Sequence, residues 1–250
     1  MSTKVSVVTV CYNAEASIGN TLKSVLEQSY RDFEYVIIDG ASKDNTLKII
    51  DSFKADFEKN GIALKVISEK DNGIYDAMNK AVRYCDGEWI IYMNADDSFA
   101  DSDVLSDIFG NNDFDGIDVI YGDSFRVRGD EKKLDIADKD LEALKLFKFF
   151  CHQATFTRRR VFNEIMFDCQ FKICADFDFF LQAYLKDYKF HHENRVVCVY
   201  SVEGTSNKSY YNTILDSYNV RIKNGIIKKS PLIKLKAFIW NIKHSLRNEW

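Results

Sequence analysis

The sequence contains 250 residues, of which 46% are hydrophobic and 29% charged, with a formal net charge of -4. This balance is typical of a folded globular protein and excludes the disordered and fibrous classes. No apolar run approaches the ~20 residues that span a bilayer, and the segment MSTKVSVVTV is too polar for a signal peptide. We therefore expect a cytoplasmic protein.

Charge and cysteine content narrow the range of partners. Residues 221–250 hold eight lysines and arginines against one acid, so the preceding 220 residues carry a net charge of -11. Such an acidic body disfavours nucleic acid as a partner, because duplex binding needs a basic surface. The six cysteines contain no C-x-x-C pair, which indicates small core residues in a reducing compartment and not zinc ligands.

The first part of the chain alternates between buried strands and amphipathic helices. Apolar, β-branched runs predict strands at 5–10, 33–38, 64–67 and 89–93. Apolar residues at helical spacing predict helices at 16–28, 44–57 and 75–85. Such alternation requires parallel strands joined by right-handed crossovers. We expect an open, mostly parallel, twisted α/β sheet with helices on both faces.

The alternation ends beyond residue 100. Strand-like segments at 119–125, 154–157 and 196–202 are separated by helical patterns of unequal length, among them an amphipathic helix at 177–185. No linker divides the two halves, so we expect the second half to extend the same sheet.

Polar loops follow all four strands of the first half, at residues 9–13, 39–44, 68–76 and 94–97. In an open α/β sheet, loops at the carboxyl ends of the strands meet where ligands bind. Asp, Asn, Ser and Gly also serve in turns and caps, which is the interpretation we favour for Asp44. For the whole set we favour a ligand site, because crowded carboxylates repel one another unless a cation or a ligand's donors compensate.

The absence of several nucleotide-binding motifs narrows the class of ligand that we expect. No G-x-G-x-x-G follows the first strand and no G-x-x-x-x-G-K-[ST] occurs, which disfavours a dinucleotide cofactor and excludes a P-loop NTPase. The first strand also ends without the aspartate nucleophile of a phosphatase. The ligand class that remains is a nucleoside diphosphate joined to another group. Tyr12 could stack on a base, Asp39 could accept from uracil or guanine N–H groups, and Asp96 could hold a divalent cation between phosphate oxygens.

Five segments, in order along the chain, match the motifs of one known family. They read VSVVTVCYNAEASIGNTLKSVLEQSYRDFEYVIIDGASKDNT, SEKDNGIYDAMNKA, MNADD, CHQATF and CADFDFF. These segments resemble glycosyltransferase family 2, and within it the small bacterial enzymes of colanic-acid, exopolysaccharide and O-antigen synthesis. The resemblance covers roughly residues 4–205. It implies the GT-A fold, a Rossmann-like sheet that binds nucleotide sugars.

The resemblance implies a role for each matching position. The nucleotide-sugar site would comprise Thr9, Cys11, Tyr12, Asn13, Asp39, Asp71, Asn72, Gly73, Asn79, Asn94 and Ala95. The family's acidic D-x-D element falls on residues 94–96, so an asparagine replaces its first acid. Asp96, with Asp97 beside it, would hold Mg²⁺ or Mn²⁺. His191 or His192 could add a ligand, although we favour surface histidines.

The family reaction is direct displacement at the anomeric carbon with inversion, and it needs a general base for the acceptor hydroxyl. Asp176 matches that base; the alternative is that it only caps the following helix. Asp178 is the second candidate. We expect His152 and Asp178 on the acceptor side, with a hydrogen-bonded core histidine as the alternative for His152.

The basic C-terminus predicts a separate amphipathic helix. Its apolar stripe comprises Leu235, Phe238, Ile239, Ile242 and Leu246, bordered by Lys236, Lys243 and Arg247. This pattern is typical of a helix on an anionic membrane surface. The alternative is that the stripe packs on the body of the protein or on a second copy in a homodimer.

The sequence thus predicts an inverting, metal-dependent bacterial glycosyltransferase. Residues 1–100 would bind a UDP-sugar or, less favoured, a GDP-sugar; residues 101–208 would bind a glycan acceptor linked to polyprenyl diphosphate; and 209–250 would form the C-terminal helical segment at the inner membrane surface. The alternatives are a nucleotidyltransferase and a catalytically silent nucleotide- or glycan-binding partner in a polysaccharide-synthesis complex. All depend on acidic loops that meet at one edge of the sheet.

Overall fold

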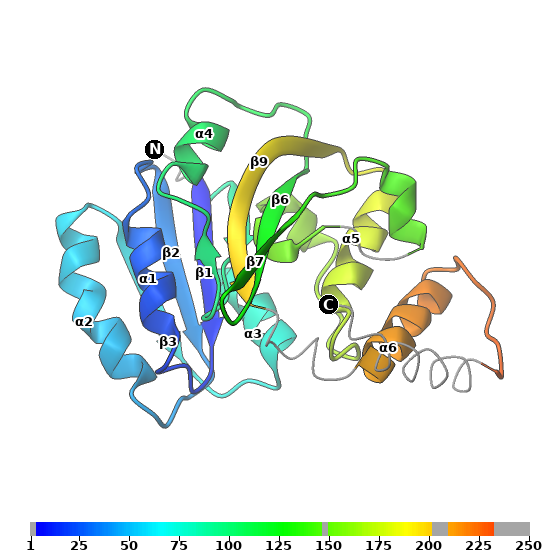
Figure 1. The fold of residues 1–250 in the computed structure, drawn as a ribbon, viewed down its shortest axis with the longest axis horizontal. Coiled ribbons are helices and arrows are strands. Elements are labelled where there is room, and N and C mark those ends of the chain that lie inside the picture. Colours follow the sequence, from blue (N-terminus) through cyan, green and yellow to red (C-terminus); the bar gives the residue numbers. More distant parts are fainter. Residues whose placement is uncertain (1–3, 147–149, 202–209, 233–250) are drawn as a thin grey trace.

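The computed structural model describes residues 4–146, 150–201 and 210–232. Its strands are β1 (Val5–Cys11), β2 (Phe33–Asp39), β3 (Ala63–Ser68), β4 (Trp89–Tyr92), β5 (Ser98–Phe99), β6 (Val119–Arg128), β7 (Glu131–Asp135), β8 (Thr155–Arg158) and β9 (Phe190–Ser201). Its helices are α1 (Ile18–Leu26), α2 (Thr46–Lys59), α3 (Ile74–Ala81), α4 (Val104–Phe109), α5 (Ala175–Leu185) and α6 (Tyr210–Lys223). The described strands form one sheet in the order β3-β2-β1-β4-β8-β6-β9-β5, with β7 on β6 (Figure 1).

The predicted parallel half of the sheet is confirmed. Strands β3, β2, β1 and β4 pair in parallel, and the register sets Cys11 opposite Asp39 and Asp39 opposite Ser68. Because β1 alone separates β2 from β4, the carboxyl ends of these two strands lie about 10 Å apart in the sheet. The loops after β1, β2, β3 and β4 therefore share one edge, as the sequence predicts.

Helices cover both faces of the sheet, and the alternation of side chains along each strand creates two cores. Val8, Val10, Val36 and Ile38 pack with α3 and α5 on one face. The intervening strand residues pack with α1, α2 and α4 on the other face. Strands β1, β2 and β4 are buried on both sides, which explains their nearly continuous apolar sequences, whereas the edge strand β3 is only partly buried.

The second half extends the sheet in mixed directions. Strand β8 is antiparallel to both β4 and β6, whereas β9 runs parallel to β6 across an irregularity near Gly122. A Cβ at Gly122 would lie 2.5 Å from the carbonyl oxygen of Arg195, so only glycine allows this approach of β9. Strand β9 begins at Phe190, earlier than predicted, because its polar residues 191–195 carry no apolar pattern.

Short and charged elements were not predicted. Strand β5 has two residues, too few for any periodicity, and β7 reads EKKLD at the edge of the sheet, where charged side chains are common. No helix within the described ranges is long and apolar enough to cross a membrane. The predicted amphipathic stripe at 235–246 lies outside the described residues.

Candidate functional site

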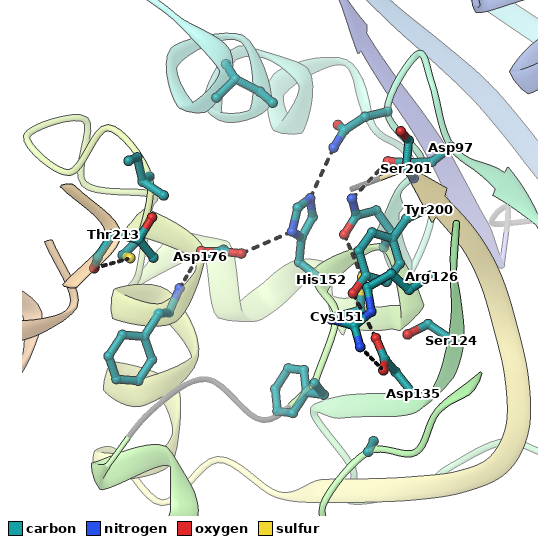
Figure 2. Close-up of a pocket in the computed structure, with 18 of the residues that line it drawn as sticks. Asp97, Ser124, Arg126, Asp135, Cys151, His152, Asp176, Tyr200, Ser201 and Thr213 are labelled. Carbon is teal, nitrogen blue, oxygen red and sulfur yellow. Dashed lines mark hydrogen bonds and ion pairs between the residues drawn. The ribbon is translucent and has the colours of Figure 1, made fainter. Parts of the chain in front are cut away.

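A cavity of about 870 Å³ opens at the carboxyl edge of the sheet (Figure 2). Its lining joins segments that are far apart in sequence: the loop after β4, the turn before β8, the start of α5, the end of β9 and one side of α6. Residues with polar or ionisable side chains in this lining include Asn94, Asp96, Asp97, Arg126, Asp135, His152, Gln153, Lys172, Asp176, Tyr200, Thr213 and Ser217.

A chain of hydrogen bonds crosses the cavity. His152 Nδ1 lies 3.1 Å from Asp176 Oδ2, and His152 Nε2 lies 3.2 Å from Asn94 Nδ2. Figure 2 shows the His152 ring directed at the Asp176 carboxylate. A neutral imidazole with its proton on Nδ1 satisfies both contacts, since Nδ1–H donates to the carboxylate and Nε2 accepts from the amide.

The Asp176 carboxylate is almost fully buried, at 4% exposure, yet it lines the cavity. Its Oδ1 accepts from the backbone N–H of Phe177 at 2.8 Å and from the Tyr75 hydroxyl at 3.3 Å. Burial and the neighbouring Asp176 raise the pKa of Tyr75 well above its usual value, so its hydroxyl remains a donor. Cys174, and not Asp176, is the N-cap of α5, and Asp176 lies in the first turn of that helix.

The two acids after β4 differ in environment. Asp97 is buried, and it accepts from Gln153 Nε2 at 2.8 Å and from the backbone N–H of Ser201 at 3.3 Å. Burial and the adjacent Asp96 raise the pKa of Asp97 to about 7. Asp96 is exposed to the cavity, and partial desolvation raises its pKa as well. Asp97 therefore ties three segments together, while Asp96 presents its carboxylate to the cavity.

The donor set of this loop suits a hard cation. Asn94 Oδ1, beside the Asp96 turn, is buried and has no hydrogen-bond partner among the residues that the structure describes. Within the described part of the chain, the cavity lining contains five aspartates, Asp96, Asp97, Asp135, Asp138 and Asp176, and two permanent cations, Arg126 and Lys172. Among the described residues, no three His, Cys, Asp or Glu side chains form a ready metal cage. The residues present therefore fit a cation that takes some of its ligands from the protein and the others from a bound anion.

A second cluster lies at the ends of β1, β2 and β3. Asp39 is fully buried and accepts from the backbone N–H of Ser42 at 3.0 Å and from Ser68 Oγ at 2.6 Å. A Cβ on Gly40 would lie 2.5 Å from Asp71 Oδ2 and 3.3 Å from Cδ2 of Tyr12, so these residues are in close contact. Tyr12 is 60% exposed. Asp39 thus orders the turn, and Tyr12 presents its ring to solvent.

Comparison with known proteins identifies the family. A family model described as Glycosyl transferase family 2 matches residues 6–188. The chain belongs to glycosyltransferase family 2. A PGL/p-HBAD biosynthesis glycosyltransferase of Mycobacterium bovis (strain BCG / Pasteur 1173P2) is 32% identical over 187 residues, covering 72% of this chain and 69% of that protein. The putative teichuronic acid biosynthesis glycosyltransferase TuaG of Bacillus subtilis is 34% identical over 95 residues, covering 38% of this chain and 36% of that protein.

Two solved structures of similar fold are complexes with nucleotide sugars. S. aureus TarS 1-349 in complex with UDP-GlcNAc has a TM-score of 0.72 at 22% identity, covering 94% of this chain and 69% of that chain. Mannosyltransferase PcManGT from Pyrobaculum calidifontis, in complex with GDP-Man and Mn²⁺, has a TM-score of 0.66 at 19% identity, covering 94% of this chain and 68% of that chain. The fold of this family 2 glycosyltransferase is therefore the predicted GT-A type.

Several predicted site residues of this glycosyltransferase have internal partners. Thr9 is fully buried, and its hydroxyl donates to the carbonyl of Met93 at 2.7 Å. Asn79 donates to the carbonyl of Phe167 at 2.8 Å and accepts from its N–H at 3.0 Å, so its amide braces that loop. Cys11 is buried next to Asp39, and desolvation raises the pKa of its thiol. None of these three residues lines the cavity.

Two further predictions about side-chain placement are corrected. Asp178 is fully buried and contacts Lys223 Nζ at 2.7 Å and Asn224 Nδ2 at 2.8 Å, so it faces α6 and does not line the cavity. His192 is not a surface residue, since its side chain is 8% exposed and its Nε2 lies 3.2 Å from Asp123 Oδ1. His191 is 42% exposed beside Glu193, and neither histidine lines the cavity.

Residues of the loops after β1, β3 and β4 make local contacts. Asn13 Oδ1 accepts from the backbone N–H of Lys43 at 2.9 Å. Asn72 donates its backbone N–H to Asp76 Oδ2 at 2.9 Å. Gly73 has φ 121°, a conformation that favours glycine, and its N–H donates to Asp71 Oδ1 at 2.9 Å. Ala95 is buried at 8% exposure. These bonds shape the loops in which Tyr12 and Asp71 lie.

Sequence reasoning missed several residues of the cavity. Tyr75 lies in the segment SEKDNGIYDAMNKA and Gln153 in CHQATF. Their contacts with Asp176 and Asp97 arise only from the tertiary fold. Thr213 and Ser217 carry no motif at all. The family model ends at residue 188, so β9 and α6 line the cavity from beyond the matched region.

Proposed function

We propose that the protein transfers a sugar from a nucleoside-diphosphate sugar, preferentially a UDP-sugar, to a hydroxyl of a glycan acceptor in bacterial surface-polysaccharide synthesis, with inversion at the anomeric carbon. The observation that carries this proposal is the placement of Asp176, whose carboxylate lines the same cavity as Asp96 and is linked through His152 to Asn94. A base and an acidic phosphate-facing turn within one cavity are what a single displacement needs.

Two neighbours of similar fold support the donor class. TarS is described in complex with UDP-GlcNAc, and PcManGT in complex with GDP-Man and Mn²⁺. In this chain, the exposed ring of Tyr12 beside Asp71 offers a stacking surface and an acceptor for a base. We place the nucleoside there and the diphosphate toward Asp96, with residues 1–100 as the donor half and 101–208 as the acceptor half.

Asp176 would act as the general base. The acceptor oxygen bonds to the anomeric carbon as the bond from that carbon to the diphosphate oxygen breaks, and the hydroxyl proton passes to Asp176. The N–H of Phe177 and the Tyr75 hydroxyl hold Oδ1, while His152 holds Oδ2. These donors fix the carboxylate in one orientation, so little reorganisation accompanies the transfer.

Departure of the diphosphate requires positive charge in an acidic cavity. Asp96 and Asn94 Oδ1 would hold Mg²⁺ or Mn²⁺ together with phosphate oxygens, with Asp97 supporting the turn from behind. When bound, the cation would neutralise charge that develops on the leaving group. The excess of carboxylates in the lining supports this assignment, because a bare diphosphate would be repelled.

For the acceptor we propose a glycan linked to polyprenyl diphosphate at the inner membrane surface. The names of the two curated relatives, which refer to PGL/p-HBAD and teichuronic acid biosynthesis, support a cell-envelope glycan. Attachment to the membrane through the stripe at 235–246, or a homodimer through the same stripe, concerns residues outside the described ranges.

The test is turnover of sugar nucleotides. Wild type is incubated with a panel of UDP- and GDP-sugars plus Mn²⁺, and release of nucleoside diphosphate is compared with that of Asp176→Asn. The matched control is Glu164→Gln, which alters an exposed carboxylate whose Oε2 lies 3.3 Å from Lys186 Nζ, outside the cavity lining. Release that requires Asp176 and ignores Glu164 supports the proposal. Calorimetric binding without any turnover would instead indicate a silent nucleotide-binding partner, and release of pyrophosphate a nucleotidyltransferase.

A further inference from the structure

Helix α6 is part of the cavity although it lies beyond the residues that the family model matches. Thr213 and Ser217 of this helix belong to the cavity lining. Figure 2 shows Thr213 on the same side of the cavity as Asp176. Asp216 directly precedes Ser217 in the sequence, and its side chain contacts the backbone before α5.

Asp216 holds the backbone just before α5. Its Oδ2 accepts a hydrogen bond from the N–H of Ile173 at 2.9 Å. The carbonyl of Ile173 accepts from the Tyr75 hydroxyl at 2.6 Å, and the same hydroxyl reaches Asp176 Oδ1 at 3.3 Å. Ile173 is therefore held from two sides, by α6 through its N–H and by α3 through its carbonyl.

The position of Ile173 determines where α5 begins. The next residue, Cys174, is the N-cap of α5, and its carbonyl accepts the N–H of Asp178 at 3.0 Å. Asp176 lies within the turn closed by this bond. A shift of Ile173 would therefore move the Asp176 carboxylate relative to the loop that carries Asp96.

A second attachment fixes the other end of α6. Lys223 Nζ contacts Asp178 Oδ2 at 2.7 Å and Asp168 Oδ2 at 2.6 Å, and Asn224 Nδ2 donates to Asp178 Oδ1 at 2.8 Å. These bonds dock α6 on α5 without involving Ile173. The docking of α6 and the placement of Ile173 can thus be separated by mutation.

We propose that Asp216 is a positioning residue for the base: it fixes the peptide of Ile173 and thereby sets the place of the Asp176 carboxylate. The inference rests on the proposed function, in which Asp176 takes the acceptor proton. Displacements of about 1 Å at a reacting group cost on the order of a hundredfold in rate, so a bond that fixes this turn has a kinetic consequence.

Three variants test the inference. Asp216→Leu keeps the branching of the side chain but has no acceptor, and Asp216→Asn keeps an oxygen acceptor. Tyr218→Phe removes a hydroxyl of α6 that contacts Ser230 and not the turn. We expect Asp216→Leu to lower kcat by on the order of tenfold to a hundredfold with an unchanged KM for the sugar nucleotide. Asp216→Asn should restore most of the rate, and Tyr218→Phe should leave kcat unchanged.

Hydrogen–deuterium exchange separates position from activity. Asp216→Leu should accelerate amide exchange in a peptide that covers residues 171–178, whereas Tyr218→Phe should not. Unchanged exchange there, or unchanged kcat with accelerated exchange, would overturn the positioning role. If the wild type turns over no sugar nucleotide, the proposed function itself fails; if the wild type is active and Asp216→Leu equals it, only this inference fails.

Discussion

His152 connects Asp176 to the loop after β4: its Nδ1 lies 3.1 Å from Asp176 Oδ2, and its Nε2 lies 3.2 Å from Asn94 Nδ2. Asn94 occupies the position where the family's acidic element begins. An amide can donate to Nε2, which a carboxylate cannot do, so the asparagine is matched to a neutral imidazole. Asn94, which replaces the first acid of that element, therefore has a hydrogen-bond partner in His152.

Two isosteric substitutions of His152 separate its contacts. An asparagine amide can occupy the place of Nδ1 and keep the bond to Asp176, whereas a glutamine amide reaches the place of Nε2 and loses it. We expect His152→Asn to retain kcat within about tenfold and His152→Gln to lose about a hundredfold. Nucleoside-diphosphate release under saturating donor measures both. Equal rates in the two variants would mean that the contact with Asp176 has no role in turnover.

Asp97 should make stability depend on pH. Burial and the neighbouring Asp96 raise its pKa from 3.8 to about 7 in the folded protein. The folded state then binds more protons than the unfolded state between these values, so stability falls as pH rises through this window and reaches its full loss above pH 7, by up to about 4 kcal/mol.

Asp97→Asn removes this titration and keeps an oxygen acceptor for the N–H of Ser201 or for Gln153. In EDTA, the difference in Tm between variant and wild type should therefore shift in favour of the variant from pH 5 to pH 8. The same comparison with Glu164→Gln, an exposed carboxylate, provides the control. A difference that stays constant across the range would show that the Asp97 pKa is ordinary.

Asp96→Asn should act on cation-assisted binding and not on the fold. Asp96 is exposed to the cavity, so its amide variant should unfold at the same temperature as the wild type. With Mn²⁺ present we expect the Kd for UDP to rise about tenfold, which corresponds to about 1.4 kcal/mol. In EDTA the variant should bind UDP at least as tightly as the wild type, because one carboxylate that repels the diphosphate is gone. Calorimetry in both buffers decides, and a loss of affinity that is independent of Mn²⁺ would remove Asp96 as a cation ligand.

Asn79 distinguishes a structural brace from a donor-site residue. Its amide makes two hydrogen bonds with the backbone of Phe167, at 2.8 and 3.0 Å. Asn79→Ala should lower the free energy of unfolding by about 2 kcal/mol, because the partners at Phe167 lose their bonds. Urea unfolding measures this loss. The KM for the sugar nucleotide should stay unchanged; a raised KM at wild-type stability would restore the predicted contact with ribose or phosphate.

Strands β1, β2 and β4 of the parallel half could be predicted because they are buried on both faces and therefore read as continuous apolar runs. Strand β9 could be predicted only from Val196 onward, since residues 191–195 are polar and show no apolar pattern; His191 and His192 pair with Ile120 and Tyr121 of β6. The direction of the strands was the hardest feature to predict from the sequence. Nothing in the segment Thr155–Arg158 shows that β8 runs antiparallel to its neighbours.

The candidate site also has features that the sequence predicts and features that it does not. Loops after parallel strands share an edge by topology, so the meeting of Asn94 and Asp96 with the start of α5 follows from motif order. Burial of individual side chains does not follow from it. Asp39 is enclosed by Ser42 and Ser68, and Asp178, two residues after Asp176, turns to Lys223. Those outcomes depend on contacts between distant segments that carry no sequence pattern.

Gly40 provides a test of the nucleoside end. A Cβ at this position would lie 2.5 Å from Asp71 Oδ2 and 3.3 Å from Cδ2 of Tyr12. Asp71 can rotate away, because the hydrogen bond that its carboxylate accepts from the described residues is a single one, from the N–H of Gly73 to Oδ1 at 2.9 Å. Gly40→Ala should therefore fold normally while it displaces the two side chains that we assign to the base. We expect the Kd for UDP to rise about tenfold, with Tm unchanged.

The matched control is Gly19→Ala, a glycine-to-alanine change in helix α1, where the nearest atom to the new Cβ would be Ile49 Cγ2 at 3.9 Å. This change should stabilise the helix by up to about 1 kcal/mol and leave UDP binding unaltered. Calorimetric titration with UDP and Mn²⁺ compares the two variants with the wild type. If Gly40→Ala binds UDP like the wild type, the base does not lie against Tyr12 and Asp71, and the nucleoside must be placed elsewhere along this edge.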